Sequence, residues 1–74
     1  MSNFKILHIP TGLYVRRGSN YSFYFYYLVS DEGDIFNLDI ENERDEEIVL
    51  EELAVYFQHN INLQSYTELL LIKI

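Results

Sequence analysis

The first half of the chain alternates apolar and polar positions with a period of two, which is the pattern of half-buried β-strands. Residues 4–9 and 13–16 both follow this pattern. Pro10, Thr11 and Gly12 separate them, and this composition favours a tight turn because proline presets one φ angle and glycine tolerates a positive one. The pattern therefore predicts an antiparallel hairpin at the start of the chain.

A third predicted strand, residues 21–29, lies in a stretch that reads SNYSFYFYYLVS and holds six aromatic rings in twelve residues. Side chains alternate across a strand, so Phe23 and Phe25 fall on one side and Tyr24 and Tyr26 on the other. We expect the phenylalanines to face a core beneath a helix and the tyrosines to lie on an open face, where their hydroxyl groups stay hydrated. The alternative is a strongly coiled small barrel that buries both sides.

The second half of the chain predicts a short strand, a helix and a closing strand. Residues 31–34 form a second turn, after which residues 35–38 pair back on the aromatic strand. Residues 45–58 place apolar side chains at helical spacing, and Asp45 suits the N-cap. Residues 66–74 alternate aliphatic side chains and fit the middle of a sheet better than an edge. The apolar stripe that the helix is expected to bury comprises Val49, Leu50, Leu53, Ala54, Tyr56 and Phe57.

Together these elements predict a single α+β domain over residues 1–74, an antiparallel sheet of four to five strands with one helix packed on one face. A chain of 74 residues is near the lower limit for a core without disulfides or metal. The absence of cysteine excludes disulfides, zinc–thiolate sites and a catalytic thiol. No stretch reaches the roughly 18 to 20 apolar residues of a membrane span and the N-terminus lacks a signal-peptide pattern, so we expect a cytoplasmic location.

The net charge of −7 is distributed unevenly along the chain. Eleven of the twelve acidic residues lie within residues 31–52, where Arg44 is the one basic residue. This segment therefore carries a charge of −10, and the remainder of the chain carries +3. Such an asymmetric field bears on solubility and on the choice of partner rather than on the fold.

Few residues suit catalysis or metal binding. His8 and His59 lack the spacing of a metal motif. We expect His8 to hydrogen-bond to the Pro-Thr-Gly turn and His59 to interact with the C-terminal end of the helix dipole. A nucleophile elbow and a glycine-rich phosphate loop are both absent from the sequence, so we predict no enzymatic activity, no cofactor and no metal site. Arg16 and Arg17 lie near the tyrosines, but direct binding of nucleic acid is not expected from so acidic a protein.

Two short motifs support a comparison with known proteins. The first has the pattern His-x-Pro-Thr-Gly-Leu-Tyr and comprises His8, Pro10, Thr11, Gly12, Leu13 and Tyr14. The second has the pattern Leu-Ser-x-x-Gly-x-hydrophobic-aromatic-Asn, which Leu28, Ser30, Gly33, Ile35, Phe36 and Asn37 fit loosely. With the hydrophobic final strand, they cover about half of the chain.

This combination resembles small uncharacterised accessory proteins of tailed bacteriophages, and neither motif is catalytic. The resemblance implies a phage origin and points towards an anti-defence, anti-CRISPR-like protein. Members of the group carry lysines in the second turn, where this chain has Asp31, Glu32 and Asp34. The resemblance therefore implies that any contact with nucleic acid through this turn is lost here.

The acidic segment leads to the main functional hypothesis. Carboxylates spaced several ångströms apart can occupy a cationic groove that normally binds a phosphate backbone. We therefore expect a non-enzymatic inhibitor, in the cytoplasm of a bacterial host, that binds a host protein or ribonucleoprotein such as a CRISPR effector. Apolar anchors are expected at Tyr24, Tyr26, Ile48 and Val55. The carboxylates predicted to bind the partner are Glu41, Glu43, Asp45, Glu46, Glu47, Glu51 and Glu52.

Two other interpretations stay open at this point. In the first, the acidic residues form a solvated helix face that keeps a small hydrophobic protein soluble. In the second, the protein is a homodimeric or larger structural accessory protein of a phage, and the tyrosine-rich sheet face is its self-complementary interface.

Overall fold

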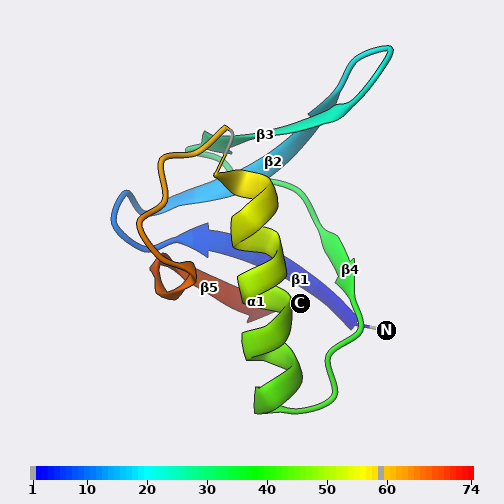
Figure 1. Cartoon of the computed structure of the whole chain (residues 1–74), viewed down its shortest axis with the longest axis vertical. Coiled ribbons are helices and arrows are strands. Elements are labelled where there is room, and N and C mark those ends of the chain that lie inside the picture. The colour runs from blue at the N-terminus through cyan, green and yellow to red at the C-terminus, as the bar shows by residue number, and fades with distance from the viewer. Residues whose placement is uncertain (1, 59) are drawn as a thin grey trace.

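The computed structural model describes residues 2–58 and 60–74 and confirms the predicted fold class, an α+β domain with an antiparallel five-stranded sheet and one helix (Figure 1). His59, predicted to lie at the helix exit, is outside the described residues. In chain order the elements are β1 (Ser2–His8), β2 (Leu13–Ser19), β3 (Tyr24–Val29), β4 (Phe36–Leu38), α1 (Glu43–Phe57), the 3-10 helix η1 (Tyr66–Glu68) and β5 (Leu69–Lys73).

Strand β1 is the centre of the sheet. Phe4 of β1 pairs with Phe36 of β4 and with Lys73 of β5, so these two strands lie on opposite edges of β1. Further along β1, Leu7 and His8 pair with both β2 and β5, so these two strands also lie on opposite edges of β1. Since β5 occupies one edge throughout, β2 and β4 share the other. Strand β3 pairs with β2 from Tyr14 to Ser19, and the two form a hairpin that projects from the body of the molecule (Figure 1).

The connection between β3 and β4 does not form the predicted hairpin. β4 pairs with β1, so the prediction that residues 35–38 return along the aromatic strand is wrong. Figure 1 shows this connection passing behind β2, on the face of the sheet away from α1. The connection passes so close to β2 at Gly33 that an added Cβ atom would lie 2.8 Å from the Tyr14 Cβ and from the Val15 carbonyl oxygen. Glycine therefore allows this approach, and it also adopts the φ angle of +68° found there.

The last strand also differs from the prediction. β5 pairs with β1 alone among the described strands, so it is an edge strand and does not lie mid-sheet. The first three residues of the predicted strand form η1 instead, and the Ser65 side chain caps this turn by accepting a 3.2 Å hydrogen bond from the Thr67 N–H.

Helix α1 begins earlier than predicted. Asn42 is the N-cap in place of Asp45, because its side chain accepts a 3.0 Å hydrogen bond from the Asp45 N–H. The Asp45 carboxylate in turn accepts a 3.1 Å hydrogen bond from the Glu41 N–H. Two backbone donors that the start of the helix would leave unpaired are thereby satisfied.

The hydrophobic core lies between the sheet and α1. Leu50, Ala54 and Phe57 are buried from the helix at spacings of four and three residues, which place them on one face. Tyr56, predicted to share this stripe, is 64% exposed, so that prediction is wrong. The other core residues are Phe4, Ile6, Val15, Ile61, Leu63, Leu69 and Leu71.

The two faces of β3 are opposite to the prediction. Tyr26 packs on the core, with its ring centroid 4.7 Å from that of Phe57. Phe25 and Tyr27 lie on the outer face, where they pair across the strands with Gly18 and Arg16. A barrel that buries both sides is excluded as well, because Tyr24 on the inner side and Tyr27 on the outer side are 64% and 40% exposed.

Candidate functional site: an acidic helix surface

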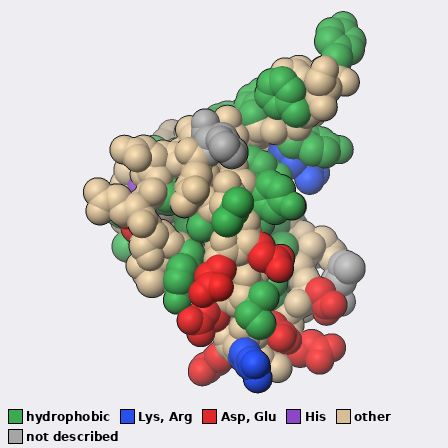
Figure 2. Space-filling view, viewed as in Figure 1, with side chains coloured by type: hydrophobic (Ala, Val, Ile, Leu, Met, Phe, Trp, Pro, Cys, Tyr) green, Lys and Arg blue, Asp and Glu red, His purple; other side chains and the backbone are tan. Residues whose placement is uncertain are grey.

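Acidic side chains gather over the first turns of α1 and the loop before it. We call the seven predicted carboxylates, Glu41, Glu43, Asp45, Glu46, Glu47, Glu51 and Glu52, the acidic surface. Figure 2 shows these turns of the helix ringed by acidic groups, with one basic side chain among them. The structure therefore places the predicted carboxylates together, because a single helix and its N-terminal loop carry all of them.

The acidic surface is not neutralised within the part of the chain that the structure describes. The ion pairs there join Lys5 to Glu32 and Arg16 to Asp31, and neither these pairs nor the contact between His8 and Glu68 includes a residue of the acidic surface. Carboxylates without counter-charges repel one another, and a cationic partner would relieve this repulsion.

Two members of the acidic surface hold the fold together. The Asp45 carboxylate accepts a 3.1 Å hydrogen bond from the N–H of Glu41 in the loop before the helix, and Glu47 Oε1 accepts a 2.9 Å hydrogen bond from the Tyr66 hydroxyl group. This contact with Glu47 raises the pKa of Tyr66 above its usual 10.0. The carboxylates best placed to bind a partner are therefore Glu41, Glu43, Glu51 and Glu52, which are exposed, and Glu46, which is half-buried.

Apolar side chains interrupt the charged groups on the same helix. Ile48 and Val55, two of the predicted apolar anchors, are 46% and 60% exposed. Tyr56 joins them, and a shallow hollow lies between Tyr56, Val55 and Glu52. Sequence analysis missed Tyr56, although its place four residues after Glu52 puts the two side chains on one face. A partner of this surface would thus meet both charge and exposed apolar area.

The two tyrosines predicted as anchors are not part of the acidic surface. Tyr26 is packed on Phe57 in the core and is a correction to the predicted site. Tyr24 is exposed, but it lies on the β2–β3 hairpin, where the guanidinium carbon of Arg17 is 5.0 Å from its ring centroid. Figure 1 places this hairpin and the start of α1 at opposite ends of the molecule.

The acidic residues of the β3–β4 connection have partners of their own. Arg16 Nη2 lies 2.7 Å from both carboxylate oxygens of Asp31. The Asp34 carboxylate accepts a 2.8 Å hydrogen bond from the Arg17 N–H, and Glu32 lies 3.6 Å from the Lys5 ammonium group. These three acids fix the crossing segment to the sheet, whereas the carboxylates of the acidic surface have no ion-pair partner among the described residues.

His8 is buried and forms a structural hydrogen-bond chain. Its Nδ1 lies 2.8 Å from the Thr11 hydroxyl oxygen, and its Nε2 lies 3.2 Å from Glu68 Oε2. The same carboxylate accepts a 3.2 Å hydrogen bond from the Gln64 N–H. These hydrogen bonds therefore connect the turn after β1 with the segment before β5. Among residues 2–58 and 60–74, no group of three or more side chains is placed to hold a metal ion.

Comparisons with protein families, with curated proteins and with solved structures found no match for this chain. In the described residues, no helix has the length and apolar character needed to cross a membrane. The class of the molecule is therefore defined by its own fold and surface, those of a small α+β domain with an acidic helix.

Proposed function

We propose that this protein is a non-enzymatic inhibitor of the kind that phages use against their hosts. It binds a nucleic-acid-processing defence complex, such as a CRISPR effector, and keeps nucleic acid away from its binding surface. One observation carries the proposal: seven carboxylates within residues 41–52 have no ion-pair partner among the described residues and surround exposed aliphatic side chains.

The acidic surface supports this role because it offers the chemistry of a phosphate chain. Arginine and lysine in a nucleic-acid groove bind carboxylate and phosphate oxygens with similar hydrogen bonds. A helix holds its carboxylates in fixed positions, so they bind a cationic groove with a smaller loss of conformational entropy than a disordered acidic segment. The inhibitor occupies the groove and undergoes no turnover.

The exposed apolar residues of α1 account for specificity. Ile48, Val55 and Tyr56 remove apolar area from water when a partner covers them, and they require a hollow of matching shape. Charge alone would bind any basic protein, whereas these side chains select among basic partners.

A competition experiment tests the proposal. Purified CRISPR effector complexes are mixed with fluorescently labelled target DNA, and the bound fraction is measured as this protein is added. We expect the protein to displace DNA, and we expect its own association rate with the effector to fall steeply between about 50 and 500 mM salt, because salt screens exposed charges.

A pair of charge-matched variants locates the binding surface. Glu43→Gln, Glu51→Gln and Glu52→Gln together change the net charge from −7 to −4 and remove exposed members of the acidic surface. The control variant carries Gln58→Lys, Asn62→Lys and Gln64→Lys, all at exposed positions, and has the same net charge of −4. We expect the first variant to lose about tenfold or more in affinity, and the control to lose much less.

Equal losses in the two variants would show that net charge acts without a defined surface and would contradict the proposal. Failure to displace DNA from any nucleic-acid-guided or nucleic-acid-cleaving complex would contradict it as well.

A further inference from the structure

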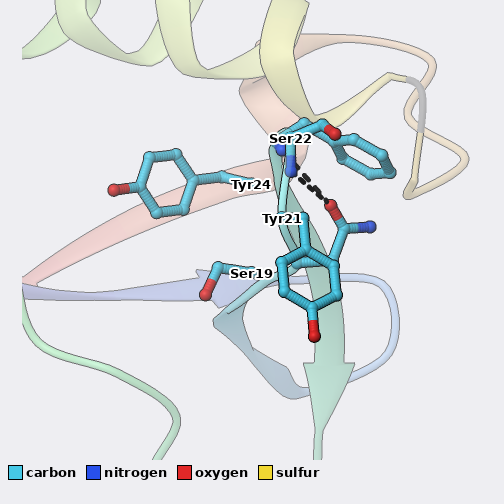
Figure 3. Close-up of a pocket in the computed structure, with 6 residues that line it drawn as sticks. Ser19, Tyr21, Ser22 and Tyr24 are labelled. Atoms are coloured by element: carbon cyan, nitrogen blue, oxygen red, sulfur yellow. Dashed lines mark hydrogen bonds between the residues drawn. The ribbon is translucent and has the colours of Figure 1, made fainter.

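The hairpin of β2 and β3 projects from the end of the molecule away from the start of α1 (Figure 1). Its tip is held by Asn20, whose side-chain oxygen accepts hydrogen bonds of 3.0 and 3.3 Å from the N–H groups of Ser22 and Phe23. Figure 3 shows these bonds, with the rings of Tyr21 and Tyr24 pointing in different directions. The tip is therefore an ordered turn that presents aromatic side chains to solvent.

One side of this hairpin carries a row of aromatic rings. Phe25 stacks on Tyr27, with ring centroids 5.9 Å apart, and Phe23 meets Phe25 edge-on at 6.5 Å. Gly18 lies beneath the Phe25 ring on the neighbouring strand, where a side chain would collide with it. We call Phe23, Phe25 and Tyr27 the aromatic stripe; its rings pack on one another and are fixed before any partner binds.

The aromatic stripe lies on the face of the sheet opposite to the helix. Tyr27 and Phe25 share their side of β3 with Val29, whereas Tyr26 and Leu28 on the other side pack on the core. Phe23 and Tyr27 remain 59% and 40% exposed. Phe25 between them is partly buried, and a packed row of rings with two of them exposed is typical of an interface.

The distribution of charge indicates which partner can approach this stripe. Residues 1–30 contain no acidic residue, and the view in Figure 2 shows no acidic side chain on the projecting hairpin. If two copies approached through their other surfaces, the net charge of −7 on each would make them repel each other. On the same face as the stripe, the acids of the β3–β4 connection already have partners: Arg16 pairs with Asp31, the Lys5 ammonium group lies 3.6 Å from Glu32, and the Arg17 N–H donates to Asp34. The stripe is thus where another copy of this chain meets the least repulsion.

We propose that the aromatic stripe is a self-association surface, on which the stripe of a second copy packs about a two-fold axis. A two-fold contact brings the same rings together from both copies, and phenylalanine needs no polar partner there. A fully covered ring buries about 150–250 Å², so two exposed rings and the partly buried Phe25 give at most about 300 Å² per copy, well below a standard interface. The dimer is therefore weak and forms at high protein concentration.

Sedimentation velocity and small-angle scattering of the intact protein test the proposal over a concentration series. We expect a monomer at about 1 µM and a growing dimer fraction towards about 1 mM. We also expect the dimer fraction to rise with salt, because salt screens the repulsion between the two acidic copies. Binding through the acidic surface has the opposite salt dependence, so failure of either proposal is seen independently of the other.

Two exposed aromatic residues off the stripe provide matched controls. Phe23→Ser should abolish the dimer, whereas Tyr24→Ser on the opposite side of the hairpin and Tyr56→Ser on the helix should leave it unchanged. Circular dichroism checks that each variant is folded. A concentration series of NMR spectra on the unmodified protein gives the same answer without mutation, with amide shift changes expected within residues 16–27.

A protein that stays monomeric up to about 1 mM at both low and high salt overturns the proposal. Loss of the dimer in Tyr24→Ser or Tyr56→Ser overturns it too, because the contact would then lie on another surface. NMR shift changes confined to the helix would have the same meaning.

Discussion

Nη2 of Arg16 lies 2.7 Å from both carboxylate oxygens of Asp31, and this contact fastens the β3–β4 connection to the outer face of the sheet. The Gly33 N–H donates a further 2.8 Å hydrogen bond to the same carboxylate. The segment crosses β2 on its way to β4 (Figure 1), and there the Asp34 N–H donates a 3.1 Å hydrogen bond to the Val15 carbonyl oxygen. Asp31 therefore serves the topology of the sheet.

We expect Asp31→Asn to lower the free energy of unfolding at neutral pH. The Gly33 N–H, and after it the Arg16 guanidinium, stabilise the charged carboxylate and hold the pKa of Asp31 below its usual 3.8. A carboxyl group with a lowered folded-state pKa stabilises the fold above its usual pKa, and this contribution is lost as the pH falls through the lowered value. Urea titrations at several pH values should show a constant difference above about pH 5 that shrinks below about pH 4. An undiminished difference at about pH 2 would contradict this assignment.

Gly33→Ala should destabilise the protein by about 1–3 kcal/mol, through both backbone strain and crowding. Its φ angle is +68°, and the added Cβ would lie 2.8 Å from Tyr14 Cβ and from the Val15 carbonyl oxygen. Gly12→Ala is the matched control, because Gly12 has a φ angle of +69° but nothing within 4 Å of the added atom. Thermal unfolding should therefore show a larger loss for Gly33→Ala. Equal losses of stability in the two variants would show that crowding of Gly33 against β2 does not add to the cost of the substitution.

Tyr66→Phe should lower stability at neutral pH and lose this effect in alkali. The tyrosine hydroxyl donates to Glu47, which favours the protonated phenol and raises the pKa of Tyr66 above 10.0. The stabilisation of the fold by this hydrogen bond is therefore fully present below the usual pKa of the phenol and is lost as the pH rises through the raised pKa of Tyr66. Urea titrations of the variant and the unmodified protein at increasing pH measure the difference. Tyr24→Phe, at an exposed position on the hairpin, serves as the control and should show no such trend.

Tyr26→Ala should cost about 2–4 kcal/mol, because it removes a ring that packs on Phe57 at the edge of the core. Tyr24→Ala, two residues away on the same side of β3, should cost less than about 1 kcal/mol, since its ring is 64% exposed. Chemical denaturation of the two variants gives the comparison. A small loss of stability for Tyr26→Ala would contradict the packing of this ring on the core and would favour the exposed position that the sequence pattern predicts.

Local sequence signals were sufficient for the first hairpin and for the existence of the helix. They failed where tertiary contacts decide the outcome. Phenylalanine is more apolar than tyrosine, so the pattern predicts Phe25 in the core, yet it is the ring of Tyr26 that packs against Phe57. The turn around Gly33 has hairpin composition, but its neighbouring acids bond to β1 and β2 rather than closing a turn.

The acidic surface was predictable as a cluster because residues close in sequence lie close on a helix. The roles of its members were not. Asp45 contacts the backbone of Glu41, and Glu47 contacts Tyr66, which is nineteen residues away. Long-range contacts of this kind leave no periodic trace in a sequence, so the division between carboxylates that stabilise the fold and carboxylates available to a partner required the structure.

The pairing of β1 with β5 joins the beginning of the chain to residues 69–73 along five paired positions. During synthesis, β1 and β2 emerge first and can form their hairpin, but one edge of β1 stays unpaired until β5 has left the ribosome. Pairing over such a long loop is entropically costly and slow, and it exposes apolar edges meanwhile. We therefore expect the newly made protein to stay sensitive to proteolysis until β5 has paired with β1.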